Sequence, residues 1–279
     1  MNNNRELLQT TPGVAASDGD GVKMTRIIGS QELNVLDPFL LLDAFESDNP
    51  DDYIGGFPSH PHRGFETVTY LLAGRMRHKD NAGNEGVIEP GGVQWMTAGK
   101  GIVHSEMPEQ ENGLLMGFQL WVNLPAAAKM SEPAYQEFAP DSVPLEQRQN
   151  GTLVRVISGT TSEGTRGPVQ NSYVEPTYMD VTLPAGEDFR QMVGASDNAF
   201  IFVIEGELLI GDSRQPLRQR ELGILGEGDR ITVSADAAAR FLLVAGQPLN
   251  EPIARGGPFV MNTKAEVMQA FTDYQTGQF

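Results

Sequence analysis

The few histidines of this 279-residue chain have a spacing that suggests metal binding. The four histidines, all in the first half of the chain, are His60, His62, His78 and His104. His60–His62 (HPH) places two imidazoles at i and i+2, which on an extended chain face one side with Cα atoms about 6.5 Å apart. His104–Glu106 (HSE) repeats this spacing with an imidazole and a carboxylate. Two such pairs on neighbouring strands predict a site with three histidines and one glutamate.

Imidazole combined with carboxylate suits Fe, Mn, Ni, Cu or Zn, and a set that leaves positions open for substrate and O₂ is nearest to non-haem Fe(II). Glu66 is a rival to Glu106, because His60-x-His62-x-x-x-Glu66 is also a metal frame. The spacing alone does not choose between the two glutamates. Since a ligating imidazole must be neutral, metal affinity is expected to fall below about pH 6.5.

The other chemistry-bearing residues have more ordinary interpretations. We expect His78 to be an ordinary surface or core histidine rather than a metal ligand. It is also a candidate for a residue that lies behind the ligands or lines the pocket. Large aromatics are more often core residues than pocket walls. Those that are candidates for an aromatic pocket are Phe57, Trp95, Phe118 and Trp121. The glycine-rich segment 97–101 lacks a phosphate-loop pattern and predicts a tight turn before His104.

Short β-type runs separated by glycine and proline predict an all-β chain. Pro61 cannot donate to a β-ladder, so the HPH segment is expected at a strand start or sheet edge near a barrel mouth. The one expected helix begins at Thr263, which forms a capping-box spacing with Glu266. Its apolar residues Val267, Ala270, Phe271 and Tyr274 fall on one face.

The chain also carries an internal echo, which predicts two related barrels. The segment 69–78 (TYLLAGRMRH) and the segment 201–210 (IFVIEGELLI) share the order apolar strand, glycine, second strand. We expect a metal-binding N-terminal barrel at 1–135, a linker at 136–150, and a histidine-free C-terminal barrel at 151–279 that ends in the packing helix. The first 20 residues show no sustained period and are expected to be frayed.

The composition excludes several functions. Without cysteine, a disulfide scaffold, a cysteine-ligated zinc site and a thiol nucleophile are all excluded. The net charge of -17 argues against nucleic acid and anionic membranes as direct partners. No apolar run approaches the roughly 20 residues of a membrane span, and the polar N-terminus lacks a signal-peptide core. We therefore expect a cytoplasmic protein.

Three stretches resemble one known family. GGFPSHPHRGFETVTYLLAG (55–74), QWMTAGKGIVHSEMP (94–108) and LWVNLP (120–125) are similar to the pirin family of the cupin superfamily. The segments 27–45 and 241–253 also resemble parts of that family. The resemblance implies a bicupin with two antiparallel barrels packed face to face and the metal in the N-terminal barrel. It implies His60, His62, His104 and Glu106 as ligands, which favours Glu106 over Glu66.

The resemblance further implies Fe(II) and a quercetin 2,3-dioxygenase activity on a flavonol-like substrate with O₂. In that reaction Glu106, once detached from the metal, is expected to act as the general base. The alternative function is a non-enzymatic, metal- and redox-dependent regulator that binds a protein partner. A third interpretation is a structural cupin with an incidental metal. Because two barrels already bury the surface that single cupins cover by dimerising, a monomer is expected.

Overall fold

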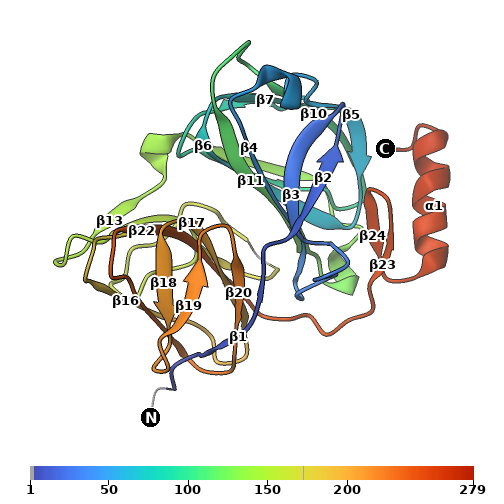
Figure 1. Cartoon of the computed structure of the whole chain (residues 1–279). Coiled ribbons are helices and arrows are strands. Elements are labelled where there is room, and N and C mark those ends of the chain that lie inside the picture. The colour runs from blue at the N-terminus through green and yellow to red at the C-terminus, as the bar shows by residue number, and fades with distance from the viewer. Residues whose placement is uncertain (1–2, 172) are drawn as a thin grey trace. The chain divides into compact units, whose positions relative to one another are not determined.

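The computed structural model describes residues 3–171 and 173–279. Within them the protein consists of antiparallel β-strands and one α-helix near the C-terminus, so the all-β prediction is confirmed. The chain divides into two compact units (Figure 1). The first barrel contains Val14–Ser142 with Leu249–Phe279, and the second barrel contains Met1–Gly13 with Val143–Pro248. No helix in the described residues has the length and apolar character needed to cross a membrane.

The first barrel contains a seven-stranded and a four-stranded sheet. The seven-stranded sheet has the order β12-β9-β6-β11-β4-β3-β2, and the four-stranded sheet has the order β5-β10-β7-β8. The strands of this barrel are β2 (Val14–Asp18), β3 (Val22–Ile28), β4 (Phe39–Ser47), β5 (Phe57–His62), β6 (Phe65–Ala73), β7 (Met76–Asp80), β8 (Glu85–Ile88), β9 (Val93–Thr97), β10 (Ile102–Pro108), β11 (Leu115–Asn123) and β12 (Ala134–Phe138).

The second barrel repeats this arrangement. Its seven-stranded sheet has the order β1-β20-β17-β22-β15-β14-β13, and its four-stranded sheet has the order β16-β21-β18-β19. Its strands are β1 (Leu7–Thr11), β13 (Leu145–Gln147), β14 (Leu153–Ser158), β15 (Thr177–Leu183), β16 (Asp188–Met192), β17 (Asn198–Glu205), β18 (Glu207–Ile210), β19 (Gln215–Arg218), β20 (Leu222–Leu225), β21 (Arg230–Ser234) and β22 (Ala239–Gly246). The two lists correspond strand for strand, which confirms the internal echo between 69–78 and 201–210.

The two termini depart from the expected domain boundaries. Residues 3–20 are not frayed along their length, because β1 pairs with β20 of the second barrel and β2 pairs with β3 of the first. Figure 1 shows β1 beside β20. The chain after Pro248 groups with the first barrel rather than with the second. The first difference arises from the pairing of β1 with the distant β20, and the second from contacts that Phe259 and Asp273 make with Arg63.

The expected linker is likewise built into the sheets. At the start of the segment 136–150, β12 pairs with β9 at the edge of the first barrel's large sheet. The next strand, β13, pairs with β14 in the second barrel. The expected linker therefore contains parts of two short edge strands, which Pro133, Pro140 and Pro144 flank.

The C-terminal segment ends in the expected helix. The helix α1 (Lys264–Gln275) begins with the predicted capping box, in which Glu266 N donates to Thr263 Oγ1 and the Glu266 carboxylate accepts from the Thr263 backbone. It follows the hairpin β23 (Ala254–Gly256) and β24 (Phe259–Met261). Asp273 of the helix forms an ion pair with Arg63, at 2.7 Å, directly after the HPH segment. The helix thus packs on the first barrel.

The second barrel has a continuous apolar interior. Its buried cluster draws on both sheets and includes Phe189, Leu208, Ile210, Ile231 and Val233. Each of these side chains is fully removed from solvent. Burial of this many large apolar side chains supplies the main stabilising free energy of the barrel.

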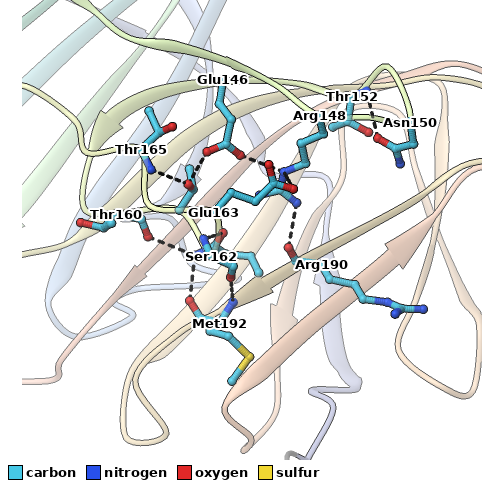
Figure 2. Close-up of polar contacts among 12 residues, drawn as sticks. Glu146, Arg148, Asn150, Thr152, Thr160, Ser162, Glu163, Thr165, Arg190 and Met192 are labelled. Carbon is cyan, nitrogen blue, oxygen red and sulfur yellow. Dashed lines mark hydrogen bonds and ion pairs between the residues drawn. The ribbon is translucent and has the colours of Figure 1, made fainter.

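A polar network ties the loop after β14 to strands of the second barrel (Figure 2). Arg148 Nε donates to Glu146 Oε1 at 2.9 Å, and the Thr161 hydroxyl donates to the other oxygen of that carboxylate. Gln191 Nε2 donates to the carbonyl of Thr160 at 3.1 Å. These contacts satisfy buried polar groups within the protein, as expected for a structural network.

Candidate metal centre

Two strands at the edge of the small sheet carry the predicted metal ligands. β5 is the edge strand and pairs antiparallel with β10. The register places His60 opposite His104 and His62 opposite Ile102. The expectation that Pro61 marks a sheet edge is confirmed, since only an edge strand tolerates the missing N–H.

The three predicted imidazoles converge. The Nε2 atoms of His60 and His62 lie 3.0 Å apart. The ring centroid of His104 lies 4.4 Å from that of His60 and 4.9 Å from that of His62. One nitrogen from each ring lies within 4.8 Å of the other two. The structure therefore brings together three residues that the i, i+2 spacings singled out.

Hydrogen bonds on the far side of two rings leave Nε2 available. His60 Nδ1 lies 2.8 Å from the carbonyl oxygen of Pro58, so we assign the ring proton to Nδ1. His104 Nδ1 lies 3.4 Å from His78 Nδ1. The buried His104 Nε2 has no hydrogen-bond partner among the described residues. A buried nitrogen without a partner costs free energy unless something ligates it, so the donor set fits a transition metal ion.

Burial keeps two of these rings neutral. Removal from water lowers the pKa of His62 well below its ordinary value, and the neighbouring His60 adds to this effect. Burial, together with the other three histidines, likewise lowers the pKa of His104. A neutral imidazole is the form that ligates a metal.

His78 lies directly behind the cluster. Its ring is fully buried, with Nδ1 facing His104 and Nε2 3.3 Å from Asp80 Oδ2. Asp80 also accepts hydrogen bonds from the backbone N and side-chain Nδ2 of Asn84. Burial raises the pKa of Asp80, but the bonds from Asn84 and His78 outweigh it and lower the pKa overall. Asp80, His78 and His104 thus form a polar string that orients the His104 ring.

The two candidate glutamates have different surroundings. Glu106 lines the same cavity as His60 and His62, and its Oε1 accepts a hydrogen bond from Thr69 Oγ1 at 2.8 Å. It is not a member of the three-nitrogen cluster. Glu66 accepts a hydrogen bond from Thr97 Oγ1 at 2.7 Å on the large sheet and is not part of the cavity wall.

The histidines open onto a large cavity of the first barrel. Its volume is about 870 Å³, within the range of roughly 300–1,000 Å³ for small-molecule sites. Of the four candidate pocket aromatics, Phe57 and Trp121 line it. Trp95 and Phe118 are buried outside its wall. The residues that line it are Asp18, Gly19, Asp20, Met24, Arg26, Leu41, Asp43, Phe45, Phe57, Pro58, His60, His62, Glu106, Gln119, Trp121, Arg255, Gly257 and Pro258.

Sequence reasoning missed the charged wall of this cavity. Arg26 binds Asp43 through Nε at 2.9 Å and Nη2 at 2.8 Å, and it binds Asp18 through Nη2 at 3.0 Å. Arg255 comes from β23, in the C-terminal segment, and lies over the Trp121 ring. The regular alternation of β3 and β4 placed Arg26 and Asp43 on neighbouring strands, but no local signal connects Arg255 with the histidines.

Comparisons with known proteins agree with this architecture. The family model for pirin matches residues 21–122, and the model for the pirin C-terminal cupin domain matches residues 178–279. A pirin-like protein from Caulobacter vibrioides is 55% identical over 99% of this chain and 99% of its own length. A pirin-like protein from Solanum lycopersicum is 46% identical over 95% of this chain and 89% of its own length.

A solved structure extends the similarity to the whole fold. The crystal structure of quercetin 2,3-dioxygenase from Acinetobacter baumannii superposes with a TM-score of 0.90 at 35% sequence identity. The match covers 99% of this chain and 98% of that chain. Both barrels of the present structure therefore have counterparts in that protein.

Proposed function

Because the chain belongs to the pirin family of two-barrel cupin proteins, we propose that it is a metal-dependent dioxygenase of the quercetin 2,3-dioxygenase type, which cleaves a flavonol with O₂. The observation that carries the proposal is the convergence of His60, His62 and His104 beside a cavity of about 870 Å³. A site that joins metal donors to a large, partly apolar cavity suits a small aromatic substrate.

We assign the metal to the Nε2 atoms of the three histidines, with Glu106 as the fourth donor. Fe(II) is the ion we propose, and Mn, Ni, Cu and Zn are the alternatives compatible with imidazole and carboxylate. When bound, the ion supplies Lewis-acid activation of the flavonol and access to O₂.

The surrounding residues position the substrate and its proton. Glu106 is buried at the cavity wall, with its Oε1 held by Thr69. We assign it the role of general base, which removes the proton of the flavonol hydroxyl at its carboxylate. Phe57 and Trp121 supply flat apolar surface, which excludes water and aligns a planar ring system.

The test is O₂ uptake by iron-loaded protein with quercetin. We expect turnover by the native chain and loss of activity in His62→Ala and His104→Ala. Gln191→Ala, in the second barrel, is the matched control and is expected to keep the activity. If both histidine variants still consume O₂ with quercetin, the assignment of the site is wrong.

A metal- and redox-dependent regulator that binds a protein partner is the alternative. A closed pocket too small for a flavonol would favour it. The cavity of about 870 Å³ favours the enzyme instead. A pull-down that captures a partner only with Fe(III) or only with Fe(II) loaded protein would support the regulator.

A further inference from the structure

The cavity wall contains an arginine whose charge is not matched by an acid. Arg255 donates from Nη1 to the carbonyl oxygen of Leu40 at 3.3 Å. Its Cζ lies 4.9 Å from the centre of the Trp121 ring. Among the residues that the structure describes, no carboxylate lies within ion-pair distance of this guanidinium. Since Arg255 is exposed at the cavity rim, a ligand can reach it.

The other arginine of the cavity, Arg26, already forms ion pairs with two acids. Arg26 is neutralised by Asp43 and Asp18, which together accept three hydrogen bonds from it. Asp43 and Asp18 also act on Arg255 at longer range, but neither forms an ion pair with it. The two arginines of the wall therefore differ. Arg26 forms ion pairs with two acids, whereas the guanidinium of Arg255 has N–H donors available to a ligand in the cavity.

The free donors of Arg255 are suited to a carboxylate. A guanidinium has five N–H donors in a planar fork, and the contact with Leu40 uses one of them. Such a fork binds carboxylates through two parallel hydrogen bonds. Contact with the Trp121 ring restricts the fork, so less conformational freedom is lost when a ligand binds.

The remaining acids of the cavity orient an anionic ligand. Asp20 and Glu106 line the same cavity without an arginine partner among the described residues. A negative group placed beside either carboxylate is repelled, whereas the same group beside Arg255 is attracted. The anionic end of a ligand is therefore expected at Arg255 rather than beside Asp20 or Glu106.

We propose that Arg255 is the specificity-determining residue of this cavity and selects planar aromatic substrates that carry a carboxylate. The inference deepens the proposed function, on which it rests for the use of this cavity as the substrate pocket. It predicts that a plain flavonol is a weaker ligand than an acidic analogue of the same ring system.

The test compares 3-hydroxyflavone with 3-hydroxyflavone-4′-carboxylate by titration calorimetry on the full-length protein as purified, without O₂. We expect the carboxylate to bind about tenfold more tightly, since a hydrogen bond to a charged group contributes on that scale. In Arg255→Gln this preference is expected to disappear through weaker binding of the carboxylate alone. Arg255→Lys keeps the charge but not the fork, so it is expected to retain part of the preference.

Arg190→Gln, which removes an exposed arginine of the second barrel, is the matched control and should keep the full preference. Equal affinity of the native protein for the two compounds overturns the proposal. Equal weakening of both compounds by Arg255→Gln also overturns it, because that result indicates packing rather than charge recognition. The proposal is also overturned if neither compound binds to the native protein.

The failure of the proposed function gives a different result. If the protein consumes no O₂ with either compound but retains the carboxylate preference, the dioxygenase proposal fails and the role of Arg255 stands. If it turns over both compounds equally and binds them equally, the role of Arg255 fails and the dioxygenase stands.

Discussion

The two barrels share one strand order but have opposite interiors. In the first barrel, β5 and β10 place His60 opposite His104. In the second, the corresponding strands β16 and β21 place Phe189 opposite Val233. Both members of the second pair belong to the continuous apolar cluster. Corresponding strands thus hold converging histidines in one barrel and part of a hydrophobic core in the other.

The difference extends one layer further back. The strand β7 supplies His78 and Asp80 behind His104, whereas its counterpart β18 supplies Leu208 and Ile210. Two polar side chains of β7 thus contrast with two apolar side chains of β18 that belong to the hydrophobic core. The comparison shows that strand order specifies the fold, while a few inward-facing positions decide whether a barrel can do chemistry.

The largest effect that tests this contrast is loss of the metal. We expect His104→Ala to purify with no stoichiometric metal, because it removes one of three converging imidazoles. Val233→Ala, in the corresponding strand β21 of the second barrel, should leave the metal content unchanged. Elemental analysis of both proteins checks the prediction. Equal metal content in the two variants would mean that the cluster is not the binding site.

Phe189 tests the opposite role of the second interior. Its side chain is fully buried among apolar residues, so Phe189→Ala is expected to lower the free energy of unfolding by about 3–5 kcal/mol. Its metal content should stay at the native level. Urea unfolding and elemental analysis measure the two quantities. Loss of metal without loss of stability would contradict the division of roles.

Acid should destabilise the metal-free protein through the first barrel. Burial holds the pKa values of His62 and His104 well below the ordinary value of about 6.5 that applies to the unfolded chain. The unfolded state therefore binds more protons as the pH falls below 6.5, and the free energy of unfolding declines. The expected slope is at most about 1.4 kcal/mol per pH unit for each histidine.

Urea unfolding of the metal-free protein between pH 7.5 and pH 5.5 measures this slope. His62→Gln/His104→Gln is the control, and its stability should depend less steeply on pH. The native and control proteins would show parallel pH dependence if the two histidines made no contribution. In contrast to the expectation from the ordinary imidazole pKa, metal binding should also persist below about pH 6.5, since protons compete less well for these buried rings.

The smallest expected effect concerns His78, which positions His104. His78→Leu, which introduces an apolar side chain of the kind found in β18, is expected to weaken metal affinity about tenfold, as loss of a partner behind a ligand generally does. His78→Gln keeps a polar group there and should retain more of the affinity. Titration with Co(II), read from its visible absorption, reports both affinity and ligand geometry. Unchanged affinity and spectrum in His78→Leu would remove His78 from the site.

The sequence contained enough local information for the fold class and the histidine cluster. Short β-type runs separated by glycine and proline predicted the all-β fold, and the i, i+2 pattern of His60–His62 needed only an extended backbone to be interpreted. The capping box at Thr263 specified the start of α1 in the same way. Each of these signals lies within a few residues of what it predicts.

The features that could not be predicted depend on distant pairing. Nothing local in residues 7–11 indicates that they add a strand to β20. Similarly, Arg255 reaches the cavity only because the C-terminal segment folds onto the first barrel. The edge strand β12 was hidden because the prolines on either side of it, Pro133 and Pro140, are equally typical of a linker.

The N-terminal segment belongs to the second barrel and the C-terminal segment to the first. This arrangement has a consequence for synthesis on the ribosome. Most of the barrel with the histidine cluster precedes the second barrel in the sequence, yet β23, β24 and α1 follow it. A nascent chain of 248 residues lacks Arg255, Gly257 and Pro258, so part of its cavity wall is missing until these residues have been made. The order of translation therefore delays a finished pocket until the second barrel has been made in full.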